Sequence, residues 1–180
     1  MIQRWDELVS ERFGGRLSRG QHAPESGRAS ALEALSVLRG IEWTDDPARL
    51  QVSDVHWLND TFADDTARAV GMRLVAETLL LWPGWTESTR VRFARLVAAR
   101  VIRDLLPIHA QAVIPSAHAW RELWDAQRLL LRPEESLSHA SLAAAVVAEA
   151  QPESQRDQLL LATCTIWRDC ATYAKEEEAQ

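Results

Sequence analysis

The chain has 180 residues, of which 47% are hydrophobic and 26% are charged, and this composition is ordinary for one soluble globular domain. The formal net charge of −6 argues against a general nucleic-acid-binding protein, which usually has a basic face or a high isoelectric point. The purely apolar runs, such as residues 79–82, are far too short to cross a bilayer. We therefore expect neither nucleic acid nor a membrane among the partners.

The two cysteines argue for a reducing compartment. Cys164 and Cys170 lie six residues apart in a segment of helical periodicity, so their side chains point in different directions. That spacing fits neither an easy disulfide within a helix nor a metal-binding motif. No basic segment followed by an apolar segment opens the chain, as a signal peptide would require. We expect a cytoplasmic protein.

The first part of the chain predicts two helices joined by a loop. Residues 2–13 place Trp5, Leu8, Val9 and Phe13 on one stripe, and a glycine pair follows. Residues 16–25 have no period and contain glycine and proline, which predicts a loop. A second helix is expected from near residue 26 to residue 39, with Gly40 as its stop.

Residues 41–65 are broken and acidic, and several aspartates stand where helices need N-caps. Asp46 precedes Pro47, which predicts a single helical turn. A second short helix is expected to begin after a cap at residue 53 or 54. Asp64 is expected to cap a helix that runs to about residue 81. The residues expected on the core face of that helix are Ala67, Val70, Leu74, Thr78 and Leu81.

The clearest helical signal covers residues 86–105, where apolar side chains and arginines fall on opposite faces. Thr86 suits the N-cap, and Pro107 cannot continue the helix. The preceding Trp-Pro-Gly-Trp, residues 82–85, predicts a type II turn with glycine at positive φ. We therefore expect helices 65–81 and 87–105 to form an antiparallel hairpin.

The rest of the sequence predicts three more helices, over about residues 116–131, 136–150 and 153–175, and an acidic tail over residues 176–180. Residues 108–114 are expected to form a short helix or an extended link. No segment alternates with period two for long enough to predict a strand. The fold class is therefore all-α: a single-domain helical bundle over residues 1–175, with about six main helices, two or three short ones and no sheet.

Four short segments carry a resemblance: GGRLSRGQHAPESGRASALEAL in the entry loop and second helix, followed by WTDDP, LND and DDTAR. Over roughly residues 14–150 the chain resembles small, all-helical, alanine-rich proteins of GC-rich bacteria whose function is uncharacterised. The second half of those proteins is often richer in alanine than this chain. The resemblance implies a helical fold and a bacterial origin, and it implies no activity, cofactor or partner.

Tryptophans and arginines are the first candidates for a binding surface, because the chain has eight tryptophans and an arginine-rich helix face. An exposed aromatic pair would be a natural hot spot for a partner protein or a second copy of the chain. Buried rings and arginines paired with acidic neighbours are the alternative interpretation. The candidate interaction residues are Trp82, Trp85, Trp120, Trp124, Arg92, Arg95 and Arg103.

A metal site is the alternative hypothesis. Clustered carboxylates in residues 42–65, with a histidine from the entry loop, would suit Mg²⁺ or Mn²⁺ in a hydrolase or transferase. Against it, capping accounts for several of the aspartates, and His22 would then be a surface residue with Glu25 at the positive end of the second helix. The candidate ligands are Asp60, Asp64, Asp65, His22 and Glu25.

Sequence motifs for nucleophiles, phosphate loops, dinucleotides and zinc hydrolases are absent. We therefore favour a non-enzymatic protein that acts by protein–protein interaction or self-association. We expect no cofactor, except a divalent metal under the alternative hypothesis.

Overall fold

Helices alone make up the regular structure in a computed structural model that describes residues 2–52, 55–105 and 133–178. The first half contains α1 (Ile2–Phe13), α2 (Ala31–Arg39), α3 (Pro47–Leu50), α4 (His56–Thr61) and α5 (Asp65–Leu81). The short 3₁₀ turn η1 (Trp82–Gly84) leads to α6 (Glu87–Ala98), which continues as the π-helical η2 (Ala99–Leu105). α9 (Pro133–Glu149) and α10 (Glu153–Glu178) complete the described chain. The predicted all-α class is confirmed, and the described ranges contain no strand.

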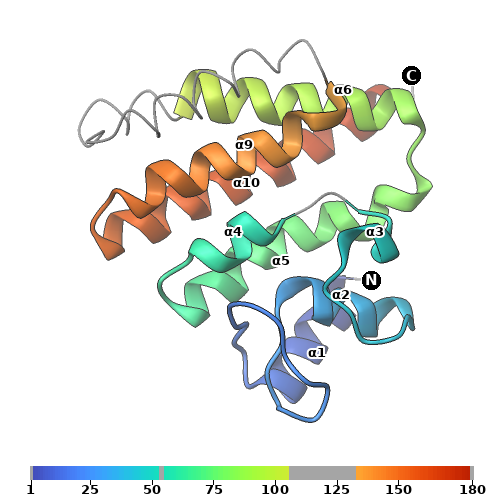
Figure 1. Ribbon diagram of the computed structural model, residues 1–180. Coiled ribbons are helices and arrows are strands. Elements are labelled where there is room, and N and C mark those ends of the chain that lie inside the picture. The colour runs from blue at the N-terminus through green and yellow to red at the C-terminus, as the bar shows by residue number, and fades with distance from the viewer. Residues whose placement is uncertain (1, 53–54, 106–132, 179–180) are drawn as a thin grey trace.

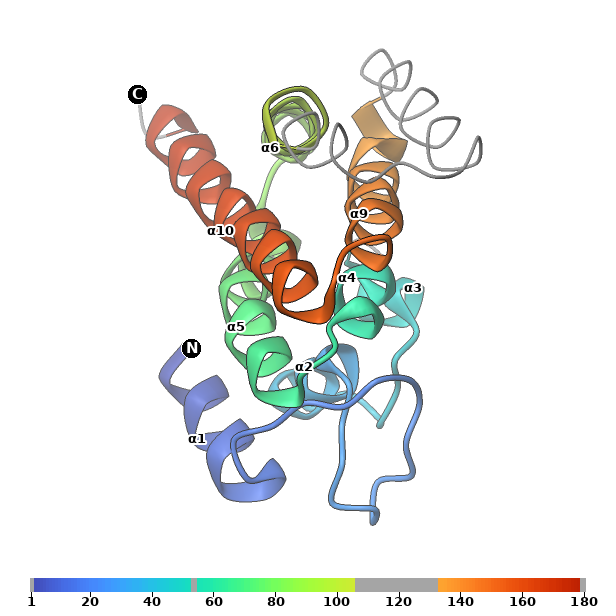
Figure 2. The same cartoon turned by 90° about the vertical axis from the view of Figure 1, so that its left-hand side faces the viewer.

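The helices stack in layers (Figure 1). α6 lies across the top, in the opening between α9 and α10, as the turned view shows (Figure 2). α10 packs on α5, and α9 packs on the short α4. α1 and α2 cover the other side of α5. α5 is therefore enclosed from two sides and forms the centre of the molecule.

The predicted hairpin of helices 65–81 and 87–105 is wrong. α5 and α6 do not pack along each other, because α10 packs against both of them. The predicted type II turn is wrong as well: Trp82 has a right-handed helical backbone and Gly84 does not adopt positive φ. Residues 82–84 form one 3₁₀ turn, and after the extended Trp85 the chain runs back as α6 in another layer of the molecule (Figure 1).

The predicted core face of α5 is wrong at Val70, whose side chain is 52% exposed. The buried apolar residues of α5 are Ala69, Met72, Val75, Ala76 and Leu79, and the helix itself packs against α10 and against α1 and α2. A helix enclosed from two sides has no single apolar stripe, so periodicity cannot identify its inward face. The predicted N-cap Asp64 is confirmed, since its side chain accepts a hydrogen bond from the Ala67 N–H.

The second helix begins later than predicted, at Ala31 instead of residue 26. Ser30 is its N-cap, with a full capping box to Glu33, and Gly27 in the preceding turn has φ +70°. Other predicted ends agree closely: Asp46 caps α3 and Thr86 caps α6. α10 continues to Glu178, into the predicted tail.

Some predicted features lie outside the described residues. They are the caps Ser53 and Asp54, the link over 108–114, the helix over 116–131, and with it Trp120 and Trp124. Among the described helices, none combines the length and apolar character that crossing a bilayer demands.

Candidate functional site

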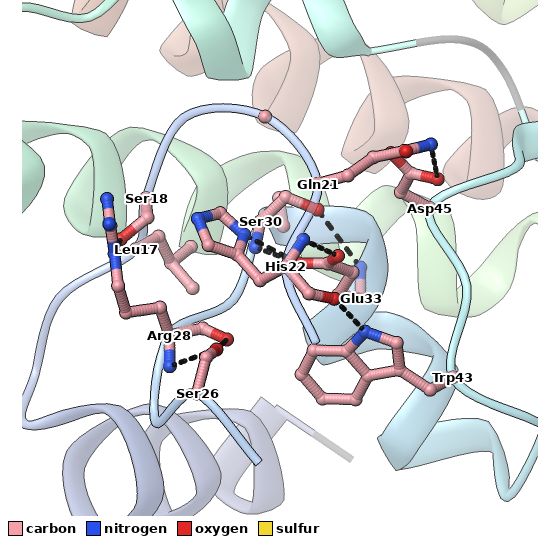
Figure 3. Close-up of polar contacts among 12 residues, drawn as sticks. Leu17, Ser18, Gln21, His22, Ser26, Arg28, Ser30, Glu33, Trp43 and Asp45 are labelled. Atoms are coloured by element: carbon pink, nitrogen blue, oxygen red, sulfur yellow. Dashed lines mark hydrogen bonds and ion pairs between the residues drawn. The ribbon is translucent and has the colours of Figure 1, made fainter. Parts of the chain in front are cut away.

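The loop between α1 and α2 is fastened to α2 by one buried carboxylate (Figure 3). Glu33 is 2% exposed. One of its oxygens, Oε1, accepts the backbone N–H of His22 at 2.6 Å. The other, Oε2, accepts the Ser30 N–H at 2.7 Å and lies 3.0 Å from Nδ1 of the His22 ring. The capping box thus gains a third partner, and the loop is held at the helix N-terminus.

Trp43 fastens the same loop from another direction. Its indole Nε1–H donates to the His22 carbonyl at 2.8 Å. The Trp43 ring packs edge-on against Phe13 of α1, and the Arg12 guanidinium lies 5.5 Å from the ring centre of Trp43. Position 22 is therefore fixed through its N–H, its carbonyl and its side chain.

The prediction that His22 is a surface residue is wrong, because its side chain is only 7% exposed. Glu25 is exposed and does not take part in this network. Since the Glu33 oxygens together take three contacts from the loop, the His22–Glu33 pair serves the fold and is not arranged as a metal site.

The other carboxylates of the alternative metal site are also engaged, each in a different place. Asp60 Oδ1 accepts the Gly20 N–H at 3.1 Å and the Asn59 side-chain amide at 2.7 Å. Asp64 caps α5, and Asp65 pairs with Arg68. Among the described residues, no three histidine, cysteine or acidic side chains are grouped as ligands. The arrangement of the candidate ligands gives the metal hypothesis no support.

Arg68 is a structural residue that sequence reasoning missed. It is buried at 2% exposure and donates hydrogen bonds to the carbonyls of Asn59, Leu17 and Phe62 at 2.6, 2.9 and 2.6 Å. It thereby joins α5 to the entry loop and to α4. An arginine in a helix that is expected to be amphipathic gives no sequence signal of such a role.

Trp82 and Trp85, two of the candidate interaction residues, belong to an aromatic cluster. Trp85 is 7% exposed and Trp82 is partly buried. Both rings contact Phe93 of α6, which in turn meets Trp167 of α10 with ring centres 5.6 Å apart. Packing of α6 onto α10 therefore accounts for this pair.

The predicted arginine face exists on α6 and its continuation. Arg92 and Arg95 are exposed, and so is Arg103, which pairs with Asp104 at 2.9 Å. The hydrogen bond from Arg103 lowers the pKa of Asp104. These arginines therefore belong to a solvated face.

Neither described thiol is a reactive nucleophile. Cys164 and Cys170 are free and buried. Burial raises the pKa of Cys164, and it raises the pKa of Cys170 as well, although a hydrogen bond from Arg100 opposes the second shift. Both thiols stay protonated at neutral pH, which removes their nucleophilic form.

Trp57 on α4 is the described tryptophan that does face solvent, with 47% of its surface exposed. Beside it lies a hollow of about 290 Å³, the Trp57 hollow. Its lining residues come from the entry loop, α4 and the end of α9; they are Arg19, His56, Trp57, Asp60, Thr61 and Glu149. The sequence signal for it was weak, because Trp57 has no aromatic neighbour in the chain.

The anchored loop builds one wall of the Trp57 hollow. Gly20 donates to Asp60, and Gln21 donates to Asp45 Oδ1 at 2.8 Å. The other Asp45 oxygen lies 3.6 Å from His56 Nε2. Together with the His22–Glu33 pair, these contacts hold the entry loop beside α4, and Arg19 of this loop lines the hollow.

An aromatic ring and carboxylates meet at the Trp57 hollow. Trp57 is about half exposed, and two carboxylates, Asp60 and Glu149, line the hollow beside one arginine, Arg19. A tryptophan face beside carboxylates attracts cationic groups. No protein-family model matches this sequence, and neither a curated protein nor a solved structure is detectably similar to it.

Proposed function

We propose that this chain is a binding protein that recognises a basic segment of a partner protein through the Trp57 hollow. The observation that carries the proposal is the 47% exposure of Trp57 beside a hollow of about 290 Å³. Large aromatic residues dominate the binding energy of protein interfaces, and a half-exposed tryptophan on a fixed helix is of that kind.

The charge around Trp57 specifies the partner. Asp60 and Glu149 supply two carboxylates to the lining against one arginine, Arg19, and the whole chain carries a net charge of −6. A lysine or arginine of the partner would lie on the Trp57 ring and pair with Glu149, which is exposed. The hydrogen bonds that fix the loop lower the cost of ordering this surface on binding. We further propose a cytoplasmic setting, in keeping with the two free thiols.

A random-peptide display selection against the native protein tests the proposal. We expect the recovered peptides to be enriched in lysine and arginine and to lose binding to the Trp57→Ser variant. Tyr173→Ser is the matched control, because Tyr173 is a similarly exposed aromatic residue on α10, at 50%. Peptides that bind Trp57→Ser as well as the native protein would overturn the proposal.

Self-association is the competing use of the same surface, and sedimentation distinguishes it. We expect the native protein to sediment as a monomer without the peptide. A dimer that Trp57→Ser dissociates would assign the Trp57 hollow to a second copy of the chain instead of a partner protein.

A further inference from the structure

A second hollow, the arginine hollow, shares no lining residue with the Trp57 hollow. It has a volume of about 420 Å³ and lies among α1, α2, α3 and the end of α5. That volume is within the range of about 300–1,000 Å³ typical of small-molecule sites. Its walls combine apolar side chains, among them Ile41, Leu50 and Leu80, with three arginines, which are Arg4, Arg39 and Arg49.

Arg39 carries a charge that no described carboxylate balances. Its guanidinium donates to the carbonyls of Leu50 and Leu79. Leu79 needs such a donor, because its helical partner four residues on is Pro83, which has no N–H. Burial lowers the pKa of Arg39, and among the described residues no acidic side chain acts against that effect. A partly buried cation held by carbonyls alone favours an anion nearby.

The other two arginines of this hollow are available to a ligand. Arg49 pairs with Glu42 at 2.7 Å, but Glu42 is 79% exposed, and surface pairs of this kind hold weakly. Arg4 is exposed on α1, and in the described ranges no acidic side chain is bonded to it. No acidic residue is among the residues that line the hollow.

We propose that the arginine hollow binds a small amphipathic carboxylate, with its carboxylate among the guanidinium groups of Arg4, Arg39 and Arg49 and its aliphatic body against Ile41, Leu50 and Leu80. The planar guanidinium donates two parallel hydrogen bonds to a carboxylate, which suits this end of the ligand. Ile41 is a large apolar residue at 36% exposure, and a ligand body would cover it. The chain as a whole has a net charge of −6, so the positive charge that would bind this anion comes from these three arginines alone.

Calorimetric titration of the whole chain with octanoate tests this site. We expect one octanoate per chain and binding at least about tenfold weaker for octanamide, which has the same body without the charge. Arg4→Glu should weaken octanoate binding by about tenfold or more, whereas Arg95→Glu, the same change on α6, should not. Ile41→Ser should weaken it too, whereas Val70→Ser, at another exposed apolar residue, should not.

Three results would overturn the proposal. They are equal affinity for octanoate and octanamide, equal losses in Arg4→Glu and Arg95→Glu, and octyl phosphate that binds far more tightly than octanoate. The first result would show that the negative charge of the ligand does not matter. The second would show that the ligand does not bind at Arg4, and the third would assign the site to phosphate esters. None of these results bears on the Trp57 hollow, so the two proposals fail separately.

Discussion

The Glu33 carboxylate contacts His22 twice, at the backbone N–H at 2.6 Å and at ring Nδ1 at 3.0 Å. A loop residue eleven positions before the glutamate is thereby locked to the first turn of α2. A carboxylate oxygen accepts, so a hydrogen bond from the ring at this contact requires the proton on Nδ1. This contact holds the entry loop beside α4 together with the Gly20–Asp60 and Trp43–His22 hydrogen bonds.

Glu33→Gln should destabilise the native state by about 1–3 kcal/mol, measured by urea unfolding. The amide replaces one accepting oxygen with a donor, which must then face the N–H of His22 or of Ser30. Glu25→Gln is the matched control, because Glu25 is exposed in the same loop, and it should change stability by less than about 0.5 kcal/mol. Equal losses of stability in the two variants would contradict the claim that Glu33 holds the entry loop on α2.

Arg68→Lys should cost about 2–4 kcal/mol of unfolding free energy, although it keeps the charge. A lysine ammonium is a single point and cannot reach three carbonyls in different directions, as the guanidinium does. Arg73→Lys is the control: Arg73 lies in a surface pair with Asp6 and is 40% exposed. Its replacement should cost at most about 1 kcal/mol. A tolerated Arg68→Lys would show that the three carbonyl contacts contribute little.

Gly71→Ala should destabilise the protein by about 1–3 kcal/mol, opposite to the usual effect of alanine inside a helix. A methyl group at position 71 would lie 2.5 Å from Cζ of Phe62 and 3.3 Å from Sγ of Cys164. Phe62→Leu should reduce the cost of the glycine change in a double-mutant cycle. Gly84→Ala, where a methyl group meets open space, should be near neutral. A stabilising Gly71→Ala would contradict the packing of α5 on α10.

Cys164 should resist alkylation by iodoacetamide at pH 8 in the native protein and react readily in urea. Burial raises the pKa of its thiol, so the reactive thiolate is scarce when the chain is folded. The same shift makes stability fall as pH rises above the pKa of an unfolded thiol, near about 8.5. Cys164→Ala should make that fall shallower. Rapid alkylation without urea would contradict the burial of this side chain.

Helix caps could be predicted from the sequence, whereas contacts between segments far apart in the chain could not. The caps Asp46, Asp64 and Thr86 follow from residue type and from the few residues beside each. The His22–Glu33 contact joins a loop to a helix, and neither residue alone shows whether it is buried. The hairpin prediction failed for a related reason: residues 82–85 fix a local bend, but α10, some seventy residues later, decides what packs against α5.

Tryptophan exposure was the least predictable part of the site. Trp85 follows a proline-glycine pair and has a second tryptophan nearby, yet Phe93 and Trp82 cover it. Trp57 stands alone in sequence and is the one of the two that faces solvent. The exposure of a side chain depends on whether another helix packs over it, and the periodicity within one helix does not contain that information.

The measurement that tests the central claim most directly is the dissociation constant of a selected basic peptide for the native protein and for Trp57→Ser, by calorimetry. Loss of an aromatic hot spot costs about 2 kcal/mol or more, so we predict a rise in the dissociation constant of roughly thirtyfold, with no change for Tyr173→Ser. Equal dissociation constants for the native protein and Trp57→Ser would contradict the claim that this surface is where the partner binds.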